Sequence, residues 1–444
     1  MKKYSVSKYA TWLLPGLQVK RWFILTFLGT VFLILGILFV FNLDPIYGVI
    51  AFLKAVVSYL NPQIVGLLLL AVGLVALYLG SKKMNVSILD AISPQDRDYI
   101  LENLYKRRKL NKGPKIVVIG GGTGLSTILK GLKTITNNLT AVVTVGDDGG
   151  SSGRLRDEFG VLPPGDIRNC IAALGDEDAL INELFQYRFK KGTGLEGHSF
   201  GNLFLSVLCE ITGDMFNAVK ESSKVLAIRG RVLPSTLDDM RLSAEMEDGR
   251  IIQGESNIPE AGGRIKRLFC EPQSPKALKE VIDALKDADI ILMGPGSLYT
   301  SVIPNLLIDE ISETISKSKA HKAYVCNVMT QPGETDGYTV SDHVKAILKH
   351  AKYENIIDTV FINNELPENL AEKYEQAGSF PVKFDKDEIK KLKLKIIGRK
   401  LIEEDKDGFV RHSYMRLARL VYMWYRYRYD TKKVNSKDKR RKNG

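Results

Sequence analysis

Residues 115–125 read KIVVIGGGTGL, which is a short apolar run, then glycines, then the start of an apolar stretch. The run Lys115–Ile119 is β-branched and short, as in a buried strand, and a helix is expected from about Leu125 to Leu132. Comparable runs follow at Ala141–Val145, Ala288–Met293, Ala323–Val328 and Thr359–Asn363. Strands that alternate with helical stretches predict an α/β, Rossmann-like fold, with a mostly parallel sheet and helices on both faces.

Glycines follow the first of these strands, at Gly120–Gly124. Glycine lets the backbone approach a ligand closely, and the N-terminus of the next helix presents N–H groups that suit phosphate. A simple tight turn is the alternative. The third glycine of a dinucleotide-binding GxGxxG motif would fall on Leu125, and no Gly-Lys-Ser/Thr follows. A dinucleotide-dependent oxidoreductase is therefore disfavoured.

The second strand leads into Gly146–Arg156, GDDGGSSGRLR. An acid at the end of a second strand commonly bonds a ribose hydroxyl, which suggests Asp147 or Asp148. Arg154 or Arg156 is a candidate for bidentate phosphate contact. A solvated Asp-Gly turn is the structural alternative.

Two further polar stretches follow. In Leu162–Asn169, LPPGDIRN, Asp166 is a candidate helix N-cap or a ligand contact. In Gly197–Asn202, GHSFGN, His198 is either a ligand contact or a packed side chain. No HExxH motif or obvious catalytic triad accompanies it.

The later strands end in Gly294–Ser301, GPGSLYTS, and in Asn327–Thr335, NVMTQPGET. The first is a second candidate anion site, and the second offers groups that suit a base or sugar edge. Because ligands of such sheets lie beyond the carboxyl ends of the strands, these loops predict one shared pocket. The candidate ligand-binding residues are Gly121, Gly122, Thr123, Gly124, Asp147, Asp148, Ser151, Ser152, Arg154, Arg156, Asp166, Asn169, His198, Asn202, Gly294, Gly296, Ser297, Asn327, Thr330 and Arg411.

The first 80 residues are far more apolar than the rest of this 444-residue chain. Charge-free runs predict two transmembrane helices, at about 22–42 and 62–80, because about 20 residues cross a bilayer. Basic residues precede the first run and follow the second, which places both ends in the cytoplasm. The expected organisation is a membrane anchor (1–84), a connector (85–112), a binding domain (113–428) and a basic disordered tail (429–444).

Charge and cysteine content limit the possible partners. The net charge is +12, and half of it lies beyond Thr431, where seven Lys or Arg residues stand against Asp438 alone. Nucleic acid, an anionic membrane surface and plain solubilisation are alternatives for this tail, and the apolar N-terminus favours the membrane. The four cysteines are widely spaced, which argues against a disulfide framework or a zinc site.

Six ordered stretches together resemble the family of gluconeogenesis factors (YvcK-like) and 2-phospho-L-lactate transferases (CofD-like). They are 120–125, 145–156, 162–169, 197–202, 294–301 and 330–335, within about 114–421. The resemblance implies a pocket for a nucleotide-linked ligand. The wording of these stretches and of Asp407–His412, DGFVRH, is closest to the gluconeogenesis-factor branch, and Arg411 is carried over from that branch's Arg-His element as a contact to a diphosphate.

The resemblance leaves two activities open. The first is a membrane-anchored regulator of cell shape and envelope synthesis that binds a UDP-sugar, namely UDP-N-acetylglucosamine, and needs no cofactor. The second is phospholactyl transfer to a deazaflavin alcohol, with Asp147 or Asp148 as a base or Mg²⁺ ligand. The expected partners are the UDP-sugar, membrane lipid, envelope-synthesis proteins and a second copy of the chain, but not nucleic acid.

Overall fold

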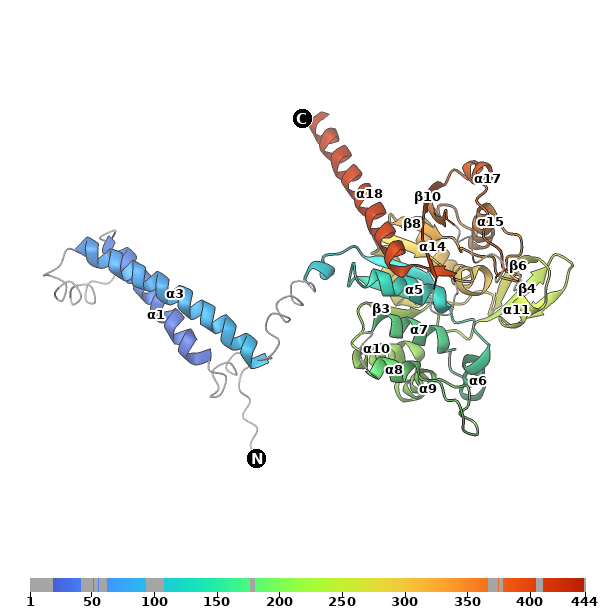
Figure 1. Ribbon diagram of the computed structural model, residues 1–444, viewed down its shortest axis with the longest axis horizontal. Coiled ribbons are helices and arrows are strands. Elements are labelled where there is room, and N and C mark those ends of the chain that lie inside the picture. The colour runs from blue at the N-terminus through green and yellow to red at the C-terminus, as the bar shows by residue number, and fades with distance from the viewer. Residues whose placement is uncertain are drawn as a thin grey trace. The chain divides into compact units, whose positions relative to one another are not determined.

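A computed structural model describes residues 19–40, 51, 55, 62–92, 108–175, 180–365, 374, 378–404 and 410–442. The chain divides into two compact units, Met1–Arg107 and Arg108–Gly444. Both are drawn in Figure 1. The segment 44–60 between the two apolar runs is expected from the sequence to be a short outer loop or an interfacial helix, and most of it lies outside the described residues.

In the described part of unit 1, helices α1 (Val19–Val40) and α3 (Pro62–Ile92) pack along their lengths. Glycines bring the two backbones together. A Cβ on Gly73 would lie 2.9 Å from the Leu33 nitrogen, and a Cβ on Gly36 would lie 2.9 Å from the Leu70 nitrogen. Because Gly80 lies against Thr26 at the other end, the helices run antiparallel. Small residues at such contacts are typical of helices that associate in a bilayer.

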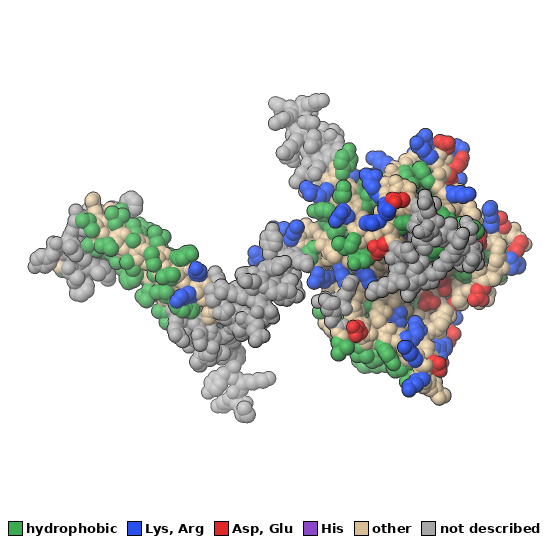
Figure 2. Space-filling view, in the orientation of Figure 1, with side chains coloured by type: hydrophobic (Ala, Val, Ile, Leu, Met, Phe, Trp, Pro, Cys, Tyr) green, Lys and Arg blue, Asp and Glu red, His purple; other side chains and the backbone are tan. Residues whose placement is uncertain are grey.

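On the face drawn in Figure 2, hydrophobic side chains cover most of the described part of this pair, with Lys or Arg side chains near one end. Among the described residues, one helix is long and apolar enough to cross a membrane, and it runs from Gln63 to Met84. The apolar stretch of α1, Ile24–Val40, is shorter. The structure thus supports one of the two predicted spans by length and composition. Near the end of the Gln63–Met84 stretch, the Lys83 ammonium lies 4.5 Å from the centre of the Trp22 ring.

Unit 2 is organised around a seven-stranded sheet with the order β10-β9-β8-β7-β1-β2-β3, in which every neighbouring pair is parallel. The strands in chain order are β1 (Ile116–Gly120), β2 (Leu139–Val143), β3 (Arg231–Pro234), β7 (Ile290–Met293), β8 (His321–Val325), β9 (Thr359–Asn363) and β10 (Lys395–Arg399). All residues of β1, β2 and β7 are buried, so both faces of the sheet are covered. This confirms the α/β fold predicted from the sequence.

The smaller sheets are antiparallel. One has the order β5-β4-β6, with β4 at Arg241–Met246, β5 at Ile251–Gln253 and β6 at Ile265–Glu271. The other pairs β11 (Ile402–Glu404) with β12 (Val410–His412), which sets Arg411 opposite Glu403.

Helices connect most of these strands. Those that matter most for the site are α5 (Gly122–Leu132) after β1, α6 (Gly150–Phe159) and α7 (Gly165–Leu174) after β2, and the π-helix η2 (Leu298–Val302) after β7. The remaining helices of unit 2 are α8 (Leu180–Gln186), α9 (Phe200–Thr212), α10 (Met215–Val225), α11 (Asn257–Glu260), α12 (Lys279–Lys286), α13 (Ile303–Leu306), α14 (Asp309–Lys317), α15 (Val340–Ala351), α17 (Lys386–Lys391) and α18 (Tyr414–Lys442).

Helix α18 packs against α5 at a point where only glycine fits. A Cβ on Gly131 would lie 2.9 Å from both the Tyr414 carbonyl carbon and the Ala418 Cβ. Leu417, Val421 and Trp424 of α18 are buried in the core. The helix continues to Lys442 and so includes most of the basic segment 429–444. This segment is predicted from the sequence to be disordered.

Candidate functional site

The candidate site lies where the direction of the strand order changes. From β1 the chain moves outward through β2 and β3, and it later returns beside β1 as β7 before moving outward on the other side. The carboxyl ends of β1 and β7 therefore face a crevice at a topological switch point, where sheets of this kind bind ligands. The two glycine-rich loops predicted from the sequence follow these two strands.

These loops touch each other. A Cβ on Gly124, in the first turn of α5, would lie 2.6 Å from the Pro295 carbonyl carbon and 2.8 Å from the Gly296 Cα. Gly294 and Gly296 have φ values of +73° and +155°, which favour glycine. Glycine is thus required at 124 by close approach and at 294 and 296 by conformation.

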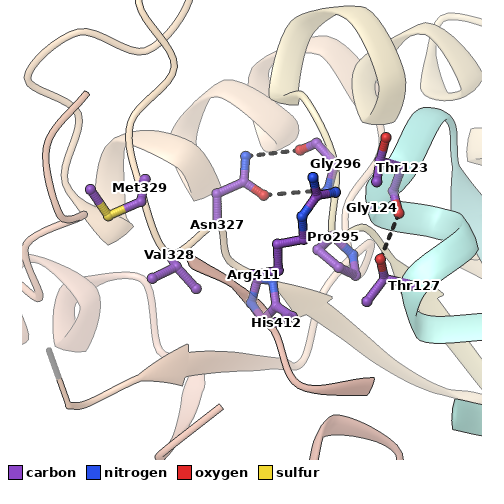
Figure 3. Close-up of a pocket in the computed structure, with 10 residues that line it drawn as sticks. All are labelled: Thr123, Gly124, Thr127, Pro295, Gly296, Asn327, Val328, Met329, Arg411 and His412. Carbon is purple, nitrogen blue, oxygen red and sulfur yellow. Dashed lines mark hydrogen bonds between the residues drawn. The ribbon is translucent and has the colours of Figure 1, made fainter. Parts of the chain in front are cut away.

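A cavity of about 230 Å³ opens beside this contact. It is lined by Thr123, Gly124, Thr127, Pro295, Gly296, Asn327, Val328, Met329, Arg411 and His412. Figure 3 shows the Arg411 side chain, from β12, extending toward Gly296 and the first turn of α5. The wall therefore combines a helix N-terminus, whose first N–H groups lack intrahelical acceptors, with a guanidinium that can donate two parallel hydrogen bonds.

Hydrogen bonds hold the loops that form the cavity. The Asn327 amide nitrogen donates to the Gly296 carbonyl at 2.9 Å, and the Gly296 N–H donates to the Asn327 side-chain oxygen at 3.3 Å (Figure 3). The Ser297 hydroxyl donates to the Gln331 side-chain oxygen at 2.6 Å. Glu334 accepts from Gln331 and from the Thr300 hydroxyl. The loops after β7 and β8 are therefore one connected structure.

A second cavity, of about 340 Å³, shares Asn327 and Val328 with the first. Its other lining residues come mainly from the end of β9 and from residues 381–384, including the exposed side chains of Asn364 and Phe384. The first cavity alone is smaller than the usual 300–1,000 Å³ of a pocket for a drug-sized ligand. The two together provide room for an extended ligand.

Three carboxyl groups near Asp147 or the start of η2 have raised pKa values. Burial, reinforced by the charge of Asp147, raises the pKa of Asp166 to about 6, although the Gly122 N–H bonds this carboxyl. Burial and Asp147 likewise raise the pKa of Glu255 to about 8, and burial raises that of Glu334 to about 7. Asp166 is the carboxyl beside the N-terminus of α5, and with a pKa of about 6 it is mostly ionised at neutral pH.

His198 belongs to a buried polar network rather than standing alone. Its Nδ1 lies 2.9 Å from the Ser151 hydroxyl, and the Asn202 amide donates to the same hydroxyl at 3.1 Å. The Ser151 hydroxyl accepts from Asn202 and also bonds His198 Nδ1, with the donor in that second bond set by the tautomer of the ring. The network ties the first turn of α6 to that of α9.

Several residues that were candidates for ligand contact instead form hydrogen bonds that hold loops of the protein together. Arg156 is buried, and it donates to Asp239 at 2.7 Å and to the Met240 carbonyl at 2.7 Å. The Asp148 carboxylate accepts from the N–H groups of Glu255 and Ser256, at 2.8 and 2.9 Å. The Thr330 hydroxyl accepts from the Phe380 N–H at 2.8 Å. These groups are occupied by the protein itself.

The remaining candidates lie outside the cavity wall. Arg154 is exposed and donates to the Glu196 carbonyl at 3.0 Å, and Asn169 accepts from Arg168 at 2.7 Å. Ser152 accepts from the Gly165 N–H at 3.2 Å. The proposed N-cap role of Asp166 is wrong, because Pro164 occupies the N-cap of α7 and Asp166 lies inside its first turn.

Some lining residues were not singled out by sequence reasoning. His412 lies next to Arg411 in β12 and is buried, and burial lowers the pKa of its imidazole to about 4, so the ring is neutral. Thr127 lies one turn beyond Thr123 and donates to its carbonyl at 2.8 Å. Helical spacing from Thr123 could have indicated Thr127, whereas Met329 carries no such signal.

A magnesium site at Asp147 and Asp148 does not fit these contacts. Both oxygens of Asp148 accept hydrogen bonds from residues 255 and 256, and Asp147 accepts from the Gly149 N–H at 2.9 Å. Within the described ranges, no three His, Cys, Asp or Glu side chains are grouped to hold a metal ion.

Comparison with known proteins relates the chain to one family. The family model described as 2-phospho-L-lactate transferase CofD matches residues 116–402. The gluconeogenesis factor of Bacillus subtilis is 52% identical over 313 residues, covering 70% of this chain and 98% of the relative. A relative from Nostoc sp. is 51% identical over 428 residues, covering 95% of this chain and 94% of its own length. A crystal structure of a Bacillus halodurans protein matches with a TM-score of 0.68 and 48% identity, over 70% of this chain and 99% of its own.

Proposed function

Because the chain belongs to the CofD-like family, among the gluconeogenesis factors, we propose that it is a membrane-anchored protein that binds a UDP-sugar, specifically UDP-N-acetylglucosamine. In this role it regulates cell shape and envelope synthesis during growth on non-sugar carbon sources. The observation that carries the proposal is the cavity at the switch point, where two glycine loops and Arg411 converge.

The diphosphate would occupy the first cavity. There the N–H groups at the start of α5 and the Arg411 guanidinium can donate to its oxygens together. The absence of a side chain at Gly124 lets the two glycine loops approach each other beside this cavity. The remainder of the ligand would extend past Asn327 and Val328 into the second cavity, where the exposed Asn364 side chain offers hydrogen bonds to a base or sugar edge.

Calorimetry on residues 108–444 tests this assignment. We expect UDP-N-acetylglucosamine to bind with a stoichiometry of one, and more tightly than GDP or NAD⁺. This fragment is a compact unit, and its Bacillus halodurans relative crystallised as a chain of which 99% is covered by the match. Heat of binding with GDP or NAD⁺ but none with UDP-N-acetylglucosamine would contradict the proposal.

The alternative activity, phospholactyl transfer, has support from the name of the family model alone. The occupied Asp148 carboxylate weakens it, since that group is then a poor base or metal ligand. Release of nucleotide from a phosphodiester-linked donor, dependent on a deazaflavin alcohol, would establish the transferase instead.

Anchoring through unit 1 is the second part of the proposal. Helix α3 would span the bilayer with α1 packed against it, and Trp22, Lys82 and Lys83 would lie at the cytoplasmic boundary. The full-length chain should therefore stay with the membrane after alkaline carbonate extraction, whereas a chain that begins at residue 108 should be released. Release of the full-length chain would refute the anchor without bearing on the pocket.

A further inference from the structure

Helix α18 has an outward face with a composition unlike that of an ordinary solvated helix. Its buried side is formed by Leu417, Ala418, Val421 and Trp424. The opposite face exposes two methionines, two tyrosines and three arginines: Met415, Arg416, Arg419, Tyr422, Met423, Arg426 and Tyr427. Exposure reaches 59% for Met423 and 76% for Tyr427.

The exposed residues form one continuous stripe. Met415, Arg419, Tyr422 and Arg426 follow each other at steps of four, three and four, so they share a face. The Arg426 guanidinium lies 6.0 Å from the centre of the Tyr422 ring. Figure 2 shows Lys and Arg side chains beside hydrophobic ones over the described part of this helix.

The last described attachment of α18 to the domain is at Arg428. Its guanidinium lies 3.2 Å from Asp358, donates to the Thr359 hydroxyl at 2.9 Å and stacks 5.1 Å from the Trp424 ring centre. The helix continues for 14 residues to Lys442. In the sequence, the segment beyond Thr431 carries seven Lys or Arg residues against Asp438 alone.

We propose that the exposed stripe of α18, together with its basic continuation, is a docking surface for the headgroup region of an anionic lipid bilayer. The proposal rests on the membrane address proposed for unit 1, which brings the domain to such a surface. Arginine and lysine attract anionic headgroups, while tyrosine rings and methionine side chains are amphipathic or apolar and suit the interface. The net charge of +6 beyond Thr431 supplies complementary charge.

Nucleic acid is the competing occupant, because arginine beside an aromatic ring can also stack on a base. The membrane is favoured by the apolar helix that the same chain carries. Binding to anionic vesicles or to RNA distinguishes the two occupants.

The experiment measures co-sedimentation of residues 108–444 with vesicles. We expect binding to phosphatidylcholine vesicles that contain about 30% phosphatidylglycerol, little binding to phosphatidylcholine alone, and loss of binding between about 0.05 M and about 0.5 M salt. Arg419→Glu combined with Arg426→Glu, and separately truncation after Asp430, should each weaken binding at least tenfold. Tyr427→Ser combined with Met423→Ser should weaken it several-fold at unchanged charge.

A charge-matched control distinguishes specific binding through α18 from non-specific electrostatic attraction of a basic protein to anionic vesicles. Lys286→Glu with Lys319→Glu makes the same charge change at two exposed lysines beside α12 and α14. This variant should keep at least half of the binding, and equal loss in both pairs would overturn the proposal. So would tight binding of a 30-nucleotide RNA, abolished by the α18 variants, without binding to vesicles.

Folding and ligand binding are followed in the same variants. Unchanged thermal unfolding and unchanged heat with UDP-N-acetylglucosamine are expected for all of them, since the substituted side chains lie outside the cavity. Failure of vesicle binding with normal sugar binding overturns the docking surface alone. Normal vesicle binding without heat from UDP-N-acetylglucosamine would support the docking surface and contradict the UDP-sugar assignment.

Discussion

Gly124→Ala is expected to weaken UDP-N-acetylglucosamine binding at least a hundredfold. The new Cβ would meet backbone atoms of the loop after β7, at 2.6 Å from the Pro295 carbonyl carbon and 2.8 Å from the Gly296 Cα. Backbone cannot move aside as a flexible side chain can, so α5 and the loop must separate. This displaces both anion-binding walls of the cavity, and the strain should lower the free energy of unfolding by about 1–3 kcal/mol.

Calorimetry and thermal unfolding on residues 108–444 measure the two effects separately. Gly175→Ala is the matched control. Gly175 has a φ of −69° and its Cβ would meet neighbours only at ordinary distances of 3.6–3.8 Å. A Gly124→Ala variant that binds as the parent does would show that the two glycine loops do not enclose the ligand.

Arg411→Ala should weaken UDP-N-acetylglucosamine binding by about tenfold to a hundredfold while leaving the fold intact. A hydrogen bond to a charged group contributes about 1.5–3 kcal/mol, and every 1.4 kcal/mol corresponds to about tenfold in affinity. Arg411→Lys should recover part of this, since lysine keeps the charge but lacks the planar fork. The exposed position of Arg411 in β12 makes a loss of stability small.

Titration calorimetry with UDP-N-acetylglucosamine and with N-acetylglucosamine alone locates the effect. The loss should affect the nucleotide sugar, because a diphosphate is the group that Arg411 is expected to hold. Arg229→Ala, at an exposed arginine just before β3, is the control for a change in net charge. Equal affinities of Arg411→Ala and the control would exclude the guanidinium from the site.

The interior of the sheet could be predicted because its strands are short, apolar and bounded by glycine or polar residues. The strand Thr359–Asn363 was predicted at the bounds that the structure gives, whereas β2 ends two residues earlier than predicted. The edge strands β3 and β10 were not predicted. β3 contains an exposed Arg231 and ends on Pro234, and β10 is only partly buried, so neither has the apolar run that marks a central strand.

The site was predicted in part for a related reason. Glycine loops at strand ends have few roles, and Gly124 and Gly296, both predicted as ligand contacts, line the cavity. An arginine or an aspartate after a strand has several roles. Arg156 bonds Asp239, 83 residues away, and Asp148 bonds Glu255, 107 residues away. Local sequence does not reveal such distant partners, so a loop-holding residue and a ligand contact look alike.

The glycine contacts between α1 and α3 bear on the history of this gene. Because the pair buries its own seam, unit 1 has the features of a cassette that could be joined to, or removed from, an existing domain without repacking that domain's core. The Bacillus subtilis relative aligns over 313 residues that make up 98% of its length, which leaves no room for such a cassette. Unit 1, and with it the proposed membrane attachment, could thus be gained or lost within the lineage in a single fusion or deletion.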